Sequence, residues 1–200
     1  MKTRLTALAL AAALGALAGA SGCTTENRAS VQTQAICMPT TACTFSAKCD
    51  AQYIGYPTVD KAVDTTGTLW LFLQIGNLLE NNANVALGRT NTNDAHIDET
   101  SIEYEGAMGG TQVVGSNYLV PAAGTSVVSA KLSLANAVAG EVVAHVRFRG
   151  YYDDGSRFET GDFPITIVVC ASGCAPAACA GLTTCPPNGE GQRPLVCGSP

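Results

Sequence analysis

Apolar and polar residues alternate along residues 140–170, the most strongly patterned part of the chain. A period of two, rich in β-branched and aromatic residues, is typical of a half-buried β-strand. The two arms flank Asp153-Asp154-Gly155-Ser156, where glycine supplies the positive φ that a tight hairpin needs. The pattern predicts a hairpin that turns at 153–156. One face should carry Val142, Ala144, Val146, Phe148, Tyr152, Phe163, Ile165, Ile167 and Val169, and the other Val143, His145, Arg147, Arg149 and Tyr151.

Further alternating stretches precede this hairpin. Residues 69–75 place leucine and isoleucine opposite Trp70 and Phe72, which predicts a central strand covered on both faces. The stretch 77–93 is rich in asparagine, a composition that favours turns and loops. No segment beyond the N-terminal 22 residues shows the period of a helix. The other strand candidates are 96–105, 111–115, 118–120 and 127–134.

About seven short strands separated by turns are typical of an antiparallel, immunoglobulin-like β-sandwich. The stretch that ends in Leu73-Gln74-Ile75-Gly76-Asn77, together with the late hairpin, resembles the immunoglobulin-like modules of bacterial surface and stress proteins. This resemblance covers residues 66–169 and implies a fold but no particular function. The Cys-Trp-Cys core signature of antibody domains is missing, because no cysteine lies between Cys49 and Cys170.

Residues 1–22 have the form of an export signal. Lys2 and Arg4 precede an apolar run of mostly leucine and alanine, which is too short to span a bilayer comfortably. Cleavage after Ala18-Gly19-Ala20 would release a soluble protein. Alternatively, Ala20-Ser21-Gly22-Cys23 resembles the lipobox of bacterial lipoproteins, in which the cysteine is acylated and becomes the N-terminus. Alanine stands at position 20, where leucine is usual in that family.

Cysteine parity favours acylation. The chain has nine cysteines, and an oxidised, exported protein tends to leave none unpaired. Acylation of Cys23 would leave eight. Zinc sites usually show C-x2-C pairs or neighbouring histidines, and neither accompanies these cysteines, so we expect disulfides rather than a metal. The expected disulfide cysteines are Cys37, Cys43, Cys49, Cys170, Cys174, Cys179, Cys185 and Cys197.

These cysteines form two clusters, three before the central domain and five after it. Both numbers are odd, so complete pairing requires at least one bridge between the clusters. Cys49 and Cys170 are the natural pair, since each lies at an edge of the domain. Such a bridge would stabilise the fold by about 4–5 kcal/mol on the chain-entropy account.

The chain therefore divides into five parts. We expect an export signal at 1–22, a flexible tether at 23–36 and an N-terminal cysteine segment at 37–50. The β-sandwich should occupy 51–170, followed by a cysteine-rich tail at 171–200.

Charge and motifs exclude several functions. Without Lys2 and Arg4 the chain has 9 basic residues (11 − 2) and 16 acidic ones, a formal charge of −7. With no basic cluster, nucleic acid and anionic headgroups are not expected as partners. The G-x-S-x-G elbow, phosphate-binding glycine loops, H-E-x-x-H and the EF-hand pattern are absent, so we expect neither a cofactor nor catalysis.

Asp94, His96 and Asp98 are the most ligand-like group, since alternation would place them on one face and oxygen ligands suit calcium. We favour a polar loop leading into an edge strand. His145 is interpreted as a surface residue rather than a catalytic base. The row that it forms with Arg147, Arg149 and Tyr151 could bind an acidic or sugar partner. We prefer a solvated sheet face with pairing to Glu159.

The whole pattern resembles small, cysteine-rich bacterial lipoproteins, a resemblance that implies export, acylation and disulfides. We expect a lipid-anchored envelope protein with a non-catalytic binding or structural role, and a protein or glycan partner. Thr24 follows Cys23 in place of an inner-membrane retention aspartate, which in such lipoproteins implies the outer membrane. Two alternatives stay open: a hydrolase using Asp94 and Asp98, and a protease-inhibitor-like module that recognises its target through the tail.

Overall fold

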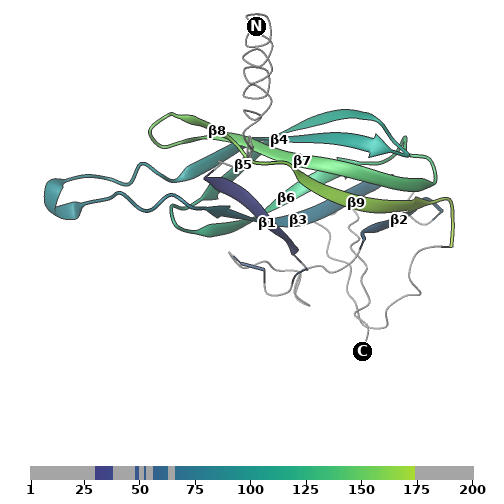
Figure 1. The fold of residues 1–200 in the computed structure, drawn as a ribbon, viewed down its shortest axis with the longest axis horizontal. Coiled ribbons are helices and arrows are strands. Elements are labelled where there is room, and N and C mark those ends of the chain that lie inside the picture. Colours follow the sequence, from purple (N-terminus) through teal and green to yellow (C-terminus); the bar gives the residue numbers. More distant parts are fainter. Residues whose placement is uncertain (1–29, 38–47, 50–51, 53–55, 63–65, 174–200) are drawn as a thin grey trace, which may run out of the picture.

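A computed structural model describes residues 30–37, 48–49, 52, 56–62 and 66–173. Within these residues the chain is all-β and forms two sheets (Figure 1), one of which curls into a half-barrel. No helix in the described part is long and apolar enough to cross a membrane. The smaller sheet has the order β1 (Val31–Cys37), β3 (Thr68–Asn77), β6 (Thr125–Ser133). The larger has the order β2 (Thr58–Asp60), β9 (Phe163–Cys170), β7 (Gly140–Tyr152), β4 (Ala95–Gly106), β5 (Gly110–Val120), with β8 (Arg157–Glu159) paired to β7.

The core lies between the apolar faces of the two sheets. Each inward position of β3 and β7 that the alternation predicted is buried, from Leu69 to Ile75 and from Val142 to Tyr152. Burying one such aliphatic or aromatic side chain contributes about 1.5–3 kcal/mol. The predicted central strand is confirmed, because β3 pairs with β1 on one side and β6 on the other.

The predicted hairpin is also confirmed. Strand β7 ends at Tyr152, β8 begins at Arg157, and Gly155 adopts φ 83° in the turn. The Asp154 carboxylate accepts hydrogen bonds from the Ser156 amide at 2.8 Å and hydroxyl at 2.6 Å. The return arm is interrupted before β9, so β7 pairs with β8 near the turn and with β9 further along.

Three expectations about the strands need correction. Residues 31–36, predicted to be tether, belong to β1, in which Val31 and Ala35 are buried. Gln32, Thr33 and Gln34 are polar and follow a polar segment, so the stretch gave little strand signal. The larger sheet is mixed rather than antiparallel, because β2 runs parallel to β9. The two short candidates at 111–115 and 118–120 form the single strand β5.

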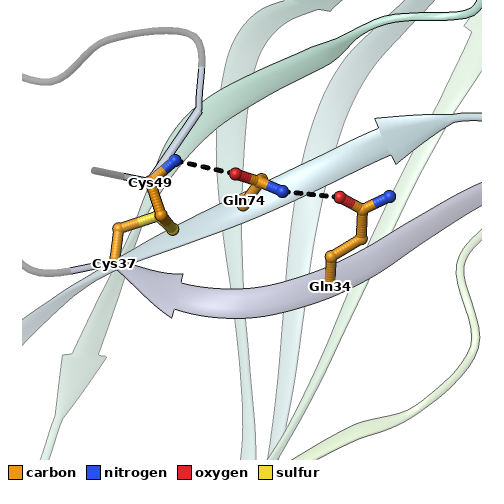
Figure 2. The surroundings of a disulfide bond; sticks show 4 residues. All are labelled: Gln34, Cys37, Cys49 and Gln74. Carbon is orange, nitrogen blue, oxygen red and sulfur yellow. Dashed lines mark hydrogen bonds between the residues drawn. A yellow bond between two sulfur atoms is a disulfide. The ribbon is translucent and has the colours of Figure 1, made fainter. Parts of the chain in front are cut away.

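The N-terminal cysteine segment is fastened to the smaller sheet by Cys37–Cys49, a disulfide with a Cα–Cα distance of 5.0 Å. Gln74 on β3 reinforces this attachment (Figure 2): its side-chain oxygen accepts from the Cys49 amide at 2.7 Å, and its NH₂ group donates to Gln34 at 2.6 Å. The predicted Cys49–Cys170 bridge is therefore wrong. Cys49 is bonded to Cys37 beside the smaller sheet, whereas Cys170 ends β9 in the larger one and is itself disulfide-bonded.

Candidate functional site

The outward face of the larger sheet carries charged side chains in rows that cross three strands. Because neighbouring strands place their outward residues side by side, acidic residues of β4 face basic residues of β7. We call this surface the ion-pair face. It comprises His96, Asp98, Glu99, Glu103, Glu105, His145, Arg147, Arg149, Tyr151, Asp153, Arg157, Glu159 and Asp162.

Arg149 lies at the centre of the first row of charged residues on the ion-pair face. The strand register places Glu99 on one side and Glu159 on the other. The guanidinium donates to Glu159 from Nε at 3.1 Å and to Glu99 from Nη1 at 2.9 Å. The hydrogen bonds to Glu159 and then Glu99 raise the pKa of Arg149, which is charged in any case. The predicted cross-strand pairing of the outer-face row with Glu159 is confirmed, and Arg149 is the residue of the row that makes it.

A second row lies nearer the turn of the hairpin and has an aromatic centre. The Tyr151 ring stacks on the His96 ring, with centroids 5.0 Å apart and planes 9° apart. Arg157 lies over the same tyrosine at 5.6 Å from the ring centroid. Arg157 also donates to Asp98 at 2.7 Å, and His96 Nε2 is hydrogen-bonded to Asp153 at 2.7 Å. His96 and Arg157 therefore each contact both the Tyr151 ring and a carboxylate.

His145 lies in a third row, on the sheet surface as predicted. Its Nδ1 donates to Asp162 at 2.6 Å, and its Nε2 lies 3.7 Å from Glu105. Arg147 Nε contacts the same Asp162 carboxylate at 3.4 Å. The hydrogen bond to Asp162 raises the pKa of His145 above its ordinary 6.5, against the opposing effect of desolvation.

The three metal candidates are not brought to one point. Asp94 accepts hydrogen bonds from the Asn91 side chain and from the Ala122 amide, while His96 and Asp98 have the partners just described. Asp98 and His96 do share the outward face, but each side chain is engaged by a different partner, Asp98 by Arg157 and His96 by Asp153. Among the described residues no group of three potential metal-ligating side chains is present.

A depression of about 670 Å³ lies between the first two rows. Gly150 lines the depression and leaves no room for a side chain, because an added Cβ would lie 1.9 Å from the His96 carbonyl oxygen and 2.9 Å from the Phe158 ring. The absence of a side chain lets β4 and β8 approach β7 closely. The depression is lined by Asp98, Glu99, Arg149, Gly150, Arg157, Phe158 and Glu159. Three carboxylates and two guanidiniums on an open surface suit recognition of a polar, charged ligand.

The sequence prediction missed part of this surface. Arg157 and Phe158 follow the turn by only a few residues, and the alternation of the return arm could have placed Arg157 outward beside Glu159. Asp162 carried no signal, because it lies in the interruption between β8 and β9. Cys23, Cys43, Cys174, Cys179, Cys185 and Cys197 lie outside the described residues, so lipidation and the remaining pairings stay predictions.

No protein-family model matches the chain, and no curated protein matches it significantly.

Proposed function

We propose that the chain is a lipid-anchored envelope protein whose β-domain binds a protein partner through the ion-pair face, without catalysis. The N-terminal lipid would be carried by Cys23. Thr24 after that cysteine supports residence at the outer membrane. Opposite charges already alternate across the rows, so a partner must present a matching charge pattern, which is how polar protein surfaces achieve specificity.

We also propose an immunoglobulin-like sandwich as the fold. The order β1-β3-β6 facing β9-β7-β4-β5 corresponds to strands A, B, E facing G, F, C, C′ of such domains. This correspondence supports the proposal, and binding through a sheet face or through loops at one end is common in that architecture.

The observation that carries the binding role is the depression of about 670 Å³ on the ion-pair face, where Arg149 and Arg157 are held by carboxylates yet remain partly exposed. A protein is favoured over a glycan. Sugars use a free aromatic face, whereas the Tyr151 ring is flanked by His96 and Arg157. Asp98, one carboxylate of the hydrolase alternative, is engaged by Arg157, which also favours binding.

Photo-crosslinking in intact cells tests the binding role. A photoreactive amino acid in place of Arg157 should give a discrete adduct, weakened at high salt. The matched control is the same amino acid in place of Val138, an exposed residue between β6 and β7. Equal adducts at both positions, or none at 157, would reject this face as the binding site.

The anchor is tested separately. Mass spectrometry of the mature N-terminus should find an acylated Cys23, and Cys23→Ser should move the protein from the membrane to the soluble fraction. An unmodified N-terminus at Ser21 would reject the anchor and leave the binding face untouched.

A further inference from the structure

Residues 78–94, between β3 and β4, form an arm that extends beyond the ends of both sheets, at the left of Figure 1. We call it the asparagine arm. All the residues from Glu80 to Thr90 are exposed, and a single 3-10 turn, η1 (Val85–Leu87), lies at the tip. Only Arg89 is charged between Asn81 and Asn93.

Side-chain amides hold the two legs of this arm together. Asn82 exchanges hydrogen bonds with the opposite leg, donating to the Thr92 hydroxyl at 2.7 Å and accepting from the Thr92 amide at 2.7 Å. Asn93 donates to the Glu80 carbonyl at 2.7 Å. Nearer the tip, the backbones of Asn84 and Arg89 exchange bonds of 3.0 and 2.9 Å. The arm is thus a built element rather than an unstructured connection.

The tip presents apolar side chains to solvent. Asn84 caps the turn by accepting from the Leu87 amide at 3.2 Å, and Gly88 ends it in the left-handed conformation with φ 64°. This geometry leaves the Val85 residue 94% exposed and the Leu87 residue 67% exposed. Single exposed aliphatics are ordinary. Two of them on one capped turn, at the end of an arm with almost no charge, are suited to contact with an apolar phase.

The place where the chain enters the domain indicates what that phase is. The Leu78 amide, at the root of the arm, donates to the Ser30 carbonyl at 2.7 Å, and the Ser30 hydroxyl is hydrogen-bonded to Tyr152. The segment from Cys23 therefore joins the domain at the root of the arm. Seven residue steps separate Cys23 from Ser30, and seven separate Leu78 from Val85. Each can reach on the order of 25 Å when extended, so a lipid on Cys23 and the arm tip can lie in one plane.

We propose that the asparagine arm is a membrane-contact element that inserts Val85 and Leu87 into the bilayer interface beside the lipid anchor. This inference rests on the proposed anchor at the N-terminus. Withdrawing one aliphatic side chain from water changes a partition constant by about tenfold or more. Two such side chains would therefore keep an already tethered domain in contact with a bilayer that contains no anionic lipid. Arg89 lies at the level of the tip, where it can pair with headgroup phosphates.

Tryptophan emission tests this contact. The mature chain from Cys23 onward, with an N-terminal polyhistidine tag in place of the acyl group, is attached to phosphatidylcholine vesicles that contain a nickel-chelating lipid. Leu87→Trp should show a blue shift on attachment. The matched control is Val138→Trp: Val138 is 65% exposed and lies between β6 and β7, at the end of the domain away from the arm. The emission of this control should not change on attachment. Both variants keep the native Trp70, so its contribution to the emission is the same in each.

Two results would overturn the proposal. One is the same shift in tryptophan emission, or no shift, for both variants on attachment to vesicles. The other is a blue shift of Leu87→Trp that depends on protein concentration without vesicles, which would assign the tip to contact between copies. As a second measurement, the untagged mature chain carrying Val85→Asp and Leu87→Asp should partition at least about tenfold less onto phosphatidylcholine vesicles than the parent. The polyhistidine anchor makes the tryptophan test independent of acylation. Whether Cys23 is acylated is decided separately, by the mass of the native N-terminus.

Discussion

Replacing Asn77 by alanine should destabilise the domain far more than the same change elsewhere in the asparagine-rich stretch. Asn77 is buried at the end of β3. Its NH₂ group donates to the Asn93 carbonyl at 2.7 Å and to the Val120 carbonyl at 3.2 Å, and its side-chain oxygen accepts from the Leu79 amide at 3.1 Å. One amide thus joins β3, β5 and both legs of the arm.

The magnitude follows from these three bonds. A hydrogen bond contributes about 0.5–1.5 kcal/mol, and a buried partner left without one costs about 1–3 kcal/mol. Asn77→Ala should therefore lower the free energy of unfolding by about 2–4 kcal/mol. The control is Asn81→Ala, because Asn81 is exposed and accepts only a local bond from Ala83 at 2.8 Å. That change should cost less than about 1 kcal/mol.

Urea titration of both variants under oxidising conditions, followed by Trp70 fluorescence, measures the difference. The midpoint should fall for Asn77→Ala with little change in the slope, since the surface exposed on unfolding is nearly the same. Amide exchange should also accelerate along the arm. A loss below about 1 kcal/mol for Asn77→Ala, or equal losses in both variants, would refute the reasoning that this amide fixes the root of the arm.

Three further results are expected. Non-reducing peptide mapping should find Cys43 bridged to a cysteine of the tail, because the Cys37–Cys49 disulfide leaves it as the odd member of its cluster; a free thiol there would contradict complete pairing. The pair of His145 with Asp162 should stabilise the fold fully below pH about 6.5 and lose its effect as pH rises through the raised pKa; in an NMR titration Asp162→Asn should lower that pKa. Gly150→Ala should cost several kcal/mol or prevent folding, since its Cβ would lie 1.9 Å from a β4 carbonyl; a wild-type urea midpoint would show that the strands can separate.

The predictable part of this fold is the part where the pattern is local. Period-two alternation placed the faces of β3 and β7 correctly, because each strand has one side in the core along most of its length. The hairpin turn followed from its residues, and its register then brought Glu159 beside Arg149. That ion pair could therefore be predicted without knowledge of the rest of the sheet.

The remainder depends on irregularities and on long-range pairing. Val31 and Ala35 stand among polar residues, and their burial depends on the pairing of β1 with β3, which is distant in the sequence. A bulge in β4 brings Glu99 as well as Asp98 to the outward face, where each pairs with an arginine, so the apparent ligand row dissolves into separate pairs. The asparagine composition indicated loops, yet these amides act in pairs across two legs, which becomes visible only when both legs are in place.

The position of the ion-pair face relative to the arm constrains the partner. Strand β7 ends and β4 begins at the end of the domain from which the arm extends, so the row of His96, Tyr151 and Arg157 lies nearest that end. The His145 row lies six residues further along β7, or about 20 Å at 3.3 Å per residue. If the lipid and the arm tip lie in a bilayer, that end of the domain faces the membrane at a distance set by the arm, up to on the order of 25 Å. A proposed partner that is bound to the same membrane and projects to that height would meet the row of His96, Tyr151 and Arg157 first, so an envelope-associated protein suits this face.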